Sequence, residues 1–572
     1  MKHLLKLLKN YKTECVLAPL FKMLEAMFDL TVPLIVAKII DVGISTGDKG
    51  FILTHFGILI LMALLGLLCS FTAQFFAAKA AIGTSKKLRR NLLSHIQTLS
   101  FSQLDKTGTS TLITRMTADI NQVQNGVNMF LRLFLRSPFI VFGAMILAFF
   151  IDFSIAIVFV GIIVVLFIIV FGIMFITNPL HKKVQENLDS VSTKTRENLS
   201  GVRVIRAFGR EKTEFDSFYE SNKSLNKSQL KVGRISALMN PLTFVVINIG
   251  IILVLWLGAD KVNSGLLLSG NIVALVNYLS QILIELVKLA NFVVLMSKAT
   301  ASMGRVGTIL DIEPSMTYGS LTEKKSNVQN AVRFENVSLY YNENSDDALS
   351  DISFSISPGE TVGIIGGTGS GKSSLVSLIA RFYDATCGTV YLMDEKISDW
   401  SQNSLRKSVT VVMQKAQLFS GTIRSNLLYG KKDATEEEMW RALELSQSAD
   451  FVRSKNNMLD AVVEQGGRNF SGGQKQRLSI ARALISNPDI LILDDSSSAL
   501  DYATDAALRK AIASLPDSLT VIIVSQRTSS IRHADKILVL DDGHLKGIGT
   551  HSNLLETCEI YREIHESAGE SV

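Results

Sequence analysis

A glycine-rich run followed by lysine and serine is the part of this 572-residue chain whose residue types most directly indicate chemistry. An apolar, strand-like run at 361–365 precedes it and a helical pattern at 375–379 follows it. In that setting the glycines let backbone amides close around a phosphate, and the helix N-terminus adds positive potential. The spacing predicts a nucleoside triphosphate site in which the lysine reaches the β/γ-phosphates and Ser373 binds Mg²⁺. The run consists of Gly366, Gly367, Thr368, Gly369, Ser370, Gly371, Lys372 and Ser373.

A second chemical element is the apolar run at 490–493, which ends in Asp494. The run is too short for an ordinary helix and indicates a parallel strand that is buried on both faces. A carboxylate at the C-terminal edge of such a strand lies beside the metal in sites that hydrolyse nucleotides. We therefore predict that Asp494 joins Ser373 around Mg²⁺.

The segment between these two elements, at 470–474, opens a helical pattern, and here the chain resembles the ATP-binding-cassette (ABC) family. The resemblance covers essentially the whole sequence, with several family elements in the family's order. It implies that Tyr341 stacks on adenine, that Gln414 is the glutamine of the Q-loop and a metal ligand, and that 498–501 forms the D-loop. Taken singly, Tyr341 also fits a core aromatic and Gln414 a surface polar residue; their place in the ordered set assigns them. Besides Tyr341 and the phosphate loop, the implied ATP-binding residues are Ser374, Ser471, Gly472, Gly473, Gln474 and Asp501.

In this family two cassettes dimerise head to tail, and each ATP lies between the phosphate loop of one chain and the signature of the other. The signature at 470–474 therefore serves the nucleotide of a partner. Its serine and glycine amides at a helix N-terminus suit the charge of the γ-phosphate.

Two positions depart from the family's pattern. Asp495 stands where the family has a glutamate as general base, and Gln526 where it has a histidine that contacts the γ-phosphate. Aspartate is one methylene shorter, which displaces the carboxylate by ~1 Å, and such a misplacement can cost on the order of 100-fold in rate. An amide still forms hydrogen bonds but cannot become an imidazolium. We predict that the site binds Mg-ATP well through Lys372, Ser373, Gln414 and Asp494. The catalytic group consists of Asp495, Gln526 and Gln414, and the two departures Asp495 and Gln526 should make its hydrolysis slow.

The two departures also predict a partner. In a homodimer both composite sites would carry them, and neither site would be efficient. We therefore expect a heterodimer in which a second half-transporter subunit supplies the glutamate and the histidine. A slow homodimer is the alternative.

The composition indicates a membrane protein with more than one domain, because 47% of the residues are apolar and they concentrate in the first half. The net charge of +6 is small for this length and gives no argument for nucleic-acid binding. The four cysteines have neither the spacing of a disulfide framework nor that of a metal site.

Six apolar segments are long enough to cross a bilayer, at 16–42, 51–78, 127–151, 153–177, 242–262 and 272–297. Basic residues follow the even-numbered spans, which predicts that both termini are cytoplasmic. Residues 1–12 place lysines opposite leucines and predict an interfacial helix.

Two polar helical stretches between the spans, at 79–124 and 181–239, are predicted to extend into the cytosol. Each has a glycine break, at Gly108 and at Gly209, where a short helix could touch a cassette. Solvated segments without such a contact are the alternative.

Ionisable and polar residues within the predicted spans admit two interpretations. They line a water-filled cavity for amphipathic or cationic cargo, or they neutralise one another, Glu285 with Lys288 and either Glu25 or Asp29 with Lys22. Asp41 at the outer end of the first span fits an extracellular gate or an ordinary interfacial acid. The polar face of the sixth span consists of Asn277, Gln281, Glu285 and Lys288.

The expected fold is multi-domain: an all-α transmembrane domain of six spanning helices at 1–314, a linker at 315–330 and an α/β P-loop ABC nucleotide-binding domain at 331–572. The resemblance implies a bacterial multidrug ABC exporter of the cytoplasmic membrane that uses ATP and Mg²⁺ to move amphipathic or drug-like molecules. A lipid, peptide or glycolipid exporter fits the same residues, and a nucleotide-gated regulatory membrane protein is the rival from another class. The expected partners are the second subunit, the bilayer and small amphipathic substrates, with no nucleic acid.

Overall fold

The computed structural model describes residues 2–325, 327–341, 347–496, 498, 500–516 and 518–567. The chain divides into two compact units. The first comprises Met1–Gln97 and Thr109–Ile312, and the second comprises Thr98–Gly108 and Glu313–Val572. Each unit is described by itself.

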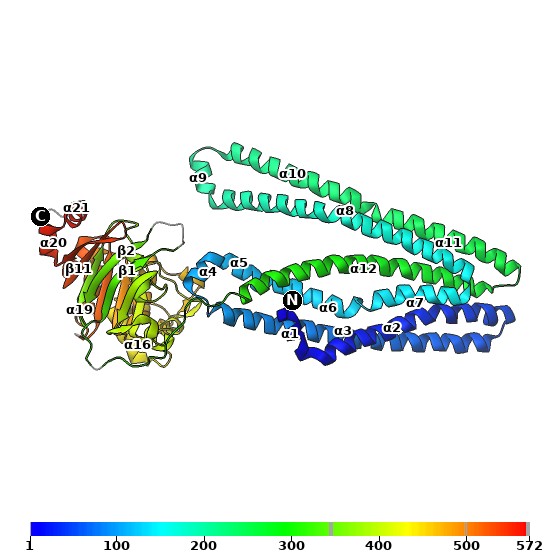
Figure 1. Cartoon of the computed structure of the whole chain (residues 1–572), viewed down its shortest axis with the longest axis horizontal. Helices are drawn as coiled ribbons and strands as arrows, with labels where there is room; N and C mark the ends of the chain where they lie inside the picture. Colours follow the sequence, from blue (N-terminus) through cyan, green and yellow to red (C-terminus); the bar gives the residue numbers. More distant parts are fainter. Residues whose placement is uncertain are drawn as a thin grey trace. The chain divides into compact units, whose positions relative to one another are not determined.

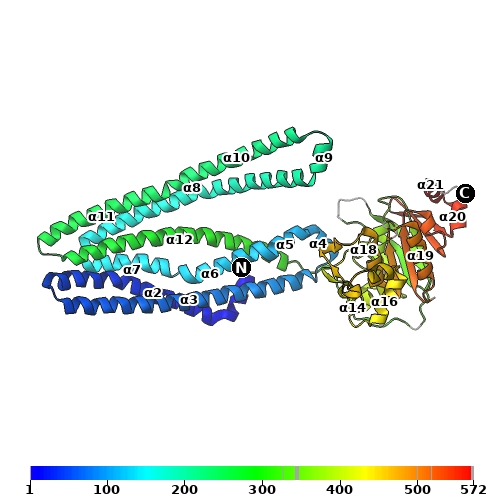
Figure 2. The ribbon, with the colours of Figure 1, turned by 180° about the vertical axis from the view of Figure 1, so that it is seen from behind.

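The first unit is all-helical, and most of its helices are long (Figure 1). α2 and α3 run side by side, and α9 joins α8 to α10 in a second hairpin (Figure 2). Aspartates begin two of the longest helices, because Asp48 accepts a hydrogen bond from the Phe51 amide and Asp152 accepts one from the Ile155 amide. The elements are α1 (Lys2–Leu8), α2 (Lys12–Lys38), a π-helical turn (Ile39–Ile44), α3 (Lys49–Ile96), α5 (Thr109–Thr114), a second π-helical turn (Arg115–Asp119), α6 (Ile120–Leu133), α7 (Arg136–Ile151), α8 (Phe153–Ser200), α9 (Val202–Ala207), α10 (Glu211–Ala237), α11 (Met239–Asn263) and α12 (Ser269–Leu310).

Among the described residues, five helical stretches are long and apolar enough to cross a membrane, judged by length and composition. α2 has 27 residues but carries Lys22, Glu25 and Asp29, and it is not among the five. The first of the six predicted spans therefore stays a prediction. The predicted third span, 127–151, is divided, because α6 ends at Leu133 and α7 begins at Arg136. The five stretches are Lys49–Ile96, Thr109–Ile151, Phe153–Ser200, Glu211–Asn263 and Ser269–Leu310.

The second unit contains two main sheets. The antiparallel sheet has the order β2-β1-β4-β5, and the larger sheet has the order β12-β11-β3-β10-β9-β6 with parallel pairing from β11 to β6. The antiparallel sheet is built from β1 (Val332–Leu339), β2 (Leu349–Ile356), β4 (Cys387–Leu392) and β5 (Glu395–Lys396). The larger sheet is built from β3 (Thr361–Ile365), β6 (Val409–Val412), β9 (Ile490–Asp494), β10 (Thr520–Ser525), β11 (Lys536–Asp541) and β12 (His544–Gly549).

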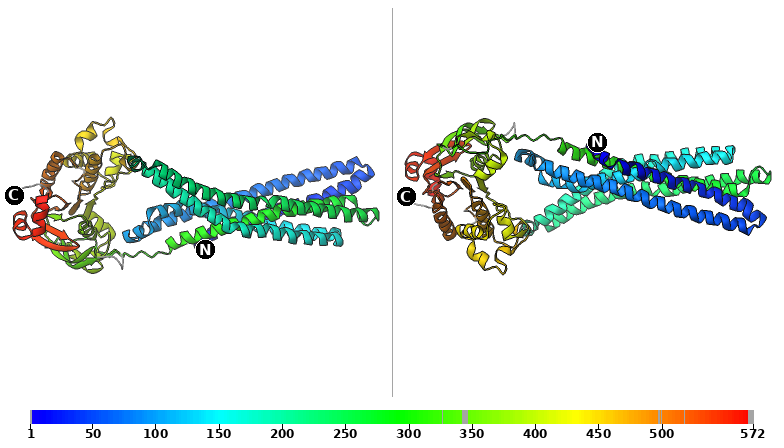
Figure 3. Two further views of the ribbon diagram at one scale, coloured as in Figure 1. Left: turned by 90° about the horizontal axis from the view of Figure 1, so that it is seen from above. Right: turned by 90° about the horizontal axis from the view of Figure 1, so that it is seen from below.

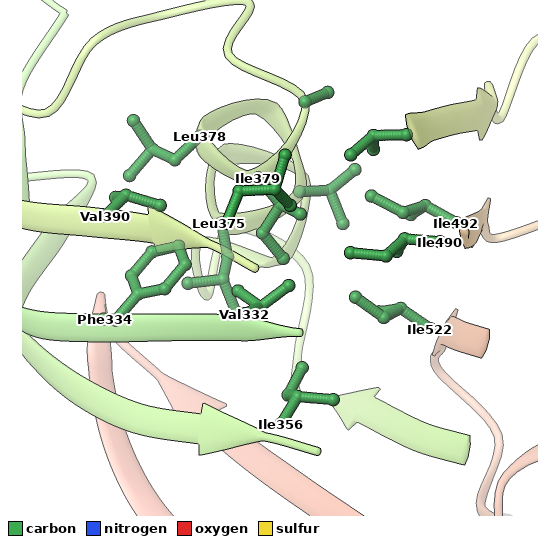
Figure 4. Close-up of a cluster of buried hydrophobic side chains, with 14 of the residues drawn as sticks. Val332, Phe334, Ile356, Leu375, Leu378, Ile379, Val390, Ile490, Ile492 and Ile522 are labelled. Carbon is green, nitrogen blue, oxygen red and sulfur yellow. The ribbon is translucent and has the colours of Figure 1, made fainter. Parts of the chain in front are cut away.

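Helix α13 (Lys372–Ile379) packs between the two sheets and organises the main core. Figure 4 shows its apolar side chains between valine, phenylalanine and isoleucine of the antiparallel sheet and isoleucines of β9 and β10. All five residues of β9 are buried, as expected of a parallel strand that is covered on both faces.

Helices surround this core. α15 (Ile423–Leu427), α16 (Glu436–Leu445), α17 (Ala449–Arg453) and α18 (Gly472–Leu484) share a separate apolar cluster. The C-terminal helices α20 (His551–Thr557) and α21 (Glu559–Ser567), red in Figure 3, pack against β12 and β11. β7 (Gly421–Thr422) and β8 (Val462–Val463) form a small separate pair.

One short helix from the first half of the sequence belongs to the second unit. This helix is α4 (Phe101–Thr107), which ends at Gly108 with a φ of 78°. The ring of Phe101 lies 4.7 Å from that of Phe382, and the Tyr383 hydroxyl donates a hydrogen bond to Asp105 at 2.5 Å. The predicted short helix that contacts a cassette is therefore confirmed at Gly108. The corresponding contact near Gly209, which follows α9, stays a prediction.

Candidate functional site

The strand order brings the predicted site residues to one edge of the larger sheet. β10 lies between β3 and β9, with Ser525 paired to Ile365 and Val524 paired to Asp494. The phosphate loop therefore leaves β3 beside the end of β10, where Gln526 follows, and Asp494 ends β9 on the other side. This is the carboxyl edge of parallel strands, where open α/β sheets bind their ligands.

The phosphate loop has a backbone that requires glycine. Gly369 and Gly371 have φ values of 88° and 94°, which side-chain-bearing residues rarely adopt. Gly366 leaves no room for a Cβ, because the Leu540 carbonyl and the Ser370 hydroxyl lie against it. The loop is therefore shaped so that its backbone amides can approach a phosphate closely.

Lys372 is buried beneath this loop, with 9% of its surface exposed. Its ammonium donates hydrogen bonds to the Gly366 carbonyl at 2.8 Å, to the Gly367 carbonyl and to the Ser370 hydroxyl at 3.3 Å. Burial lowers the pKa of Lys372, and the nearby carboxylates of Asp495 and Asp494 oppose that shift. Among the described residues it makes no salt bridge. A buried cation that contacts only neutral oxygens suits an anionic ligand such as a phosphate group.

Of the three metal ligands that the sequence predicted, Ser373 and Asp494 lie together, whereas a metal-binding role for Gln414 stays a prediction. The Ser373 hydroxyl donates to the Asp494 carboxylate at 3.4 Å, and Asp494 is 7% exposed. Burial raises the pKa of Asp494, and the negative charge of Asp495 adds to that effect. The described residues contain no cluster of three or more His, Cys, Asp or Glu side chains that could hold a metal alone. Two oxygen donors fit Mg²⁺, which usually completes its coordination with water and substrate phosphates.

The two departures lie at the same edge. Asp495 has a φ of 45°, in the left-handed region that aspartate tolerates better than most residues. The Gln414 side-chain amide donates to the Asp495 carboxylate at 3.0 Å, so the glutamine lies beside the candidate base. Gln526 is exposed directly after β10.

Tyr341 has a half-exposed ring with two contacts inside the second unit. Its hydroxyl forms a hydrogen bond with the Ser374 hydroxyl at 2.9 Å, and its ring meets that of Tyr383 edge-on at 5.1 Å between centroids. Tyr383 in turn donates to Asp105 on α4, and burial together with that carboxylate raises the pKa of Tyr383. Sequence reasoning missed Tyr383, because it belongs to no motif. The contacts connect α4 to the start of the phosphate-loop helix.

The signature forms an exposed helix start. Ser471 begins α18, accepting a hydrogen bond from the Gln474 amide at 3.3 Å, and the Gln474 side chain accepts one from the Ser471 amide at 3.1 Å. A Cβ added at Gly472 would meet nothing within 4 Å, and Gly473 follows it in the first turn. The first turn of α18 therefore offers free backbone amides to a ligand.

In the D-loop, Asp501 begins α19 (Tyr502–Ala513). It accepts hydrogen bonds from the Thr504 amide at 2.9 Å and the Thr504 hydroxyl at 2.7 Å, and these bonds lower the pKa of Asp501. Ala499 of the same loop lies outside the described residues.

In the helical unit, Arg136 joins three helices at the break between α6 and α7. Its guanidinium donates to Glu285 on α12 at 2.9 Å and to Asp29 on α2 at 2.8 Å. Ser137 also donates to Glu285, at 2.7 Å. Sequence reasoning missed Arg136, although a guanidinium inside an apolar stretch was the available signal.

The ion pairs that the neutralisation interpretation predicted are present, whereas the predicted cargo cavity stays a prediction. Lys288 lies 2.8 Å from Glu285, and Lys22 lies 2.6 Å from Glu25. Asp29 pairs with Arg136. On the polar face of α12, the Asn277 side chain bonds to the Val273 carbonyl of its own helix, and Gln281 donates to the Asp29 carbonyl at 3.3 Å.

Asp41 has a structural contact at the other end of α12. Its carboxylate accepts a hydrogen bond from the Gly270 amide at 2.6 Å, and Gly270 lies too close to the Ala37 carbonyl for a Cβ to fit. Asp41 thus satisfies an amide in the first turn of a helix distant in sequence. A gate role for it stays a prediction.

Comparison with known proteins identifies both units. The family description "ABC transporter transmembrane region" matches residues 15–286, and "ABC transporter" matches residues 349–498. An uncharacterised ABC transporter ATP-binding protein of Bacillus subtilis (strain 168) is 34% identical over 568 residues, covering 99% of this chain and 98% of the relative. An ATP-dependent lipid A-core flippase of Pasteurella multocida is 27% identical over 566 residues, covering 99% of this chain and 97% of the flippase.

A solved structure of a bacterial Atm1-family ABC exporter with ATP bound has the same fold. The TM-score is 0.81 at 22% sequence identity, covering 98% of this chain and 99% of the other. At 22% identity the similarity shows the fold alone.

Proposed function

Because the chain belongs to the ABC transporter family and has the exporter fold, with ATP-driven transport as its activity, we propose that it is one half of a heterodimeric exporter. The proposed cargo is an amphipathic or drug-like small molecule. The proposed location is the bacterial cytoplasmic membrane, with both termini in the cytoplasm. One membrane unit and one cassette per chain support a half-transporter, which needs a second cassette to close its composite sites.

In this proposal the phosphate-loop amides and Lys372 bind the β- and γ-phosphates of ATP. Ser373 and Asp494 hold Mg²⁺, which when bound neutralises charge on the phosphate oxygens. Tyr341 stacks on adenine, for which its half-exposed ring is available. The buried lysine without a salt bridge among the described residues supports phosphate as the ligand.

The proposal of slow hydrolysis is supported mainly by the positions of Asp495 and Gln526, which lie at the same edge of the sheet as the phosphate loop. Asp495 holds the position of a general base but reaches ~1 Å less far than a glutamate. Gln414 donates a hydrogen bond to that carboxylate and would orient it toward a water molecule. Gln526 can donate or accept a hydrogen bond at the γ-phosphate but carries no charge there. ATP then stays bound for longer than it would in a site with glutamate and histidine.

The same reasoning requires a partner with complete chemistry. The signature of this chain has an exposed helix start, where Ser471 and Gln474 form a capping box. It would complete the partner's site, where hydrolysis resets the transporter. α4 and Tyr383 would carry closure of the cassettes to the membrane unit.

Phosphate-release assays on this chain alone and with the product of a neighbouring half-transporter gene test the proposal. We expect slow turnover alone and brisk turnover together, with the partner's catalytic glutamate required. Brisk turnover by the single chain would reject the heterodimer.

A lipid exporter is the second candidate, because one relative carries the name of a lipid A-core flippase. The charges at the junction of α2, α7 and α12 do not favour either cargo, because three basic side chains there pair with three acidic ones. The basic residues are Lys22, Arg136 and Lys288, and the acidic residues are Glu25, Asp29 and Glu285. Transport of a labelled lipid and of a cationic dye in inverted vesicles would separate the two. Uphill accumulation in the same vesicles would exclude a nucleotide-gated channel, which only dissipates gradients.

A further inference from the structure

A cavity of about 820 Å³ lies within the helical unit, between α1, α2, α6 and α12. We call it the N-terminal cavity. Its wall is almost entirely apolar, and Lys9 and Lys12 are its only charged lining residues. The lining consists of Leu4, Leu5, Leu8, Lys9, Lys12, Cys15, Val16, Pro19, Val123, Gly126, Val127, Phe130, Leu131, Phe134, Leu135, Met296, Ala299 and Thr300.

The volume is in the range of about 300–1,000 Å³ that holds one small ligand or lipid chain. Close packing of α6 on α12 forms the floor, because Gly126 lies directly against Ala299 and leaves no room for a Cβ. Several wall side chains remain largely exposed, among them Val16 at 66% and Phe134 at 48%. A contiguous apolar surface of this kind indicates a site that binds an apolar partner.

Lys9 and Lys12 give one end of this cavity a positive charge. Both are exposed, and no acidic side chain belongs to the lining. The nearest acid in sequence, Glu14, is occupied by Lys79 at 2.9 Å. An occupant that satisfies the whole site must be apolar at one end and negatively charged at the other.

The place of the two lysines next to α1 supports a membrane-surface ligand, because Lys9 begins the 3-10 turn that follows α1 (Lys9–Tyr11) and Lys12 is the first residue of α2. α1 buries Leu4 and Leu7 and exposes Lys2 and Lys6 outside the cavity, which is typical of a helix that lies along a membrane surface. Anionic headgroups and acyl chains meet at that depth.

We propose that the N-terminal cavity binds one anionic phospholipid, with an acyl chain against the apolar wall and the phosphate at Lys9 and Lys12. The assignment to the cytoplasmic leaflet rests on the proposed orientation, whereas binding itself does not. The chain end of the lipid contacts Phe134 and Leu135, which form the break before Arg136. The lipid is thus a bound component of the junction between α2, α7 and α12 and differs from the transported cargo.

Native mass spectrometry of the full chain in detergent tests the proposal, with dioleoyl-phosphatidylglycerol and dioleoyl-phosphatidylcholine as probes. We expect one retained phosphatidylglycerol, preferred over phosphatidylcholine by about 30-fold, the size expected for two lysines beside an anionic lipid. The double variant Lys9→Glu/Lys12→Glu should lose this preference. The matched control Lys2→Glu/Lys6→Glu makes the same charge change on the same surface outside the cavity and should retain it.

The variant Cys15→Trp fills the wall and should weaken binding of both lipids. Equal affinity for the two lipids in the unmodified chain would overturn the proposal and leave a neutral apolar occupant. Equal loss of preference in the matched control would also overturn it, because bulk surface charge would then explain the effect. The measurement needs neither nucleotide nor partner, so failure of the heterodimer would leave its outcome unchanged.

Discussion

Lengthening the candidate base, Asp495→Glu, tests the slow-site proposal most directly. The change restores the ~1 Å of reach that separates aspartate from glutamate, which corresponds to about 100-fold in rate or about 2.7 kcal/mol of barrier. Strain in the backbone at this position sets the lower bound of the expected gain in rate. Asp495 has a φ of 45°, and a left-handed conformation costs a glutamate roughly 1 kcal/mol more than it costs an aspartate.

If the loop relaxes to relieve that strain, the carboxylate shifts and about 1 kcal/mol of the gain is lost, which leaves about 20-fold. We therefore expect Asp495→Glu to raise the turnover of the isolated chain by about 20- to 100-fold. The contact from Gln414 at 3.0 Å tolerates the longer side chain, because both partners are flexible at their ends.

The assay is phosphate release at saturating Mg-ATP, from the single chain reconstituted in lipid nanodiscs. Asp495→Asn is the matched control: it keeps the length and the backbone tolerance and removes the negative charge, so turnover should not rise. Lys372→Ala sets the background. An unmodified chain that already turns over near the enzyme median of about 10 s⁻¹ would refute the reasoning, and so would an Asp495→Glu variant no faster than its parent.

Three further outcomes follow from the same contacts. The fold-increase in turnover caused by Gln526→His should be larger in the Asp495→Glu variant than in the unmodified chain, because both groups act on one catalytic step. Equal fold-increases in phosphate release in the two backgrounds would contradict this. Tyr383→Phe removes the hydroxyl that bonds to α4 but keeps the aromatic contact. It should leave ATP affinity unchanged, lower the free energy of unfolding by about 1 kcal/mol and reduce the transport per ATP hydrolysed. Unchanged transport would count against a role of Tyr383 in transmitting closure of the cassettes. Arg136→Met should destabilise the chain by about 3 kcal/mol in denaturant unfolding in detergent, and a second change, Glu285→Gln, should recover part of the loss; additive losses would show that the two charges do not interact.

Local motifs were predictable because they are encoded by contiguous residues. The glycines of the phosphate loop, Lys372, Ser373 and the strand that ends in Asp494 are found in the expected elements. Five of the six predicted spans were predictable from their apolar runs, although the third is broken between α6 and α7. The first span, on the charged helix α2, stays a prediction.

The amino-acid sequence by itself determined the nucleotide chemistry and the two departures, since side-chain type and chain position suffice for those. Only the tertiary structure decided which strands are neighbours and so brought Gln526 and Asp494 to one edge. It also decided that Arg136 pairs with Glu285 across 149 positions and that Tyr383 meets Asp105 across 278. Such pairings depend on how buried charges and polar groups find partners once the elements pack, and no local pattern records that choice.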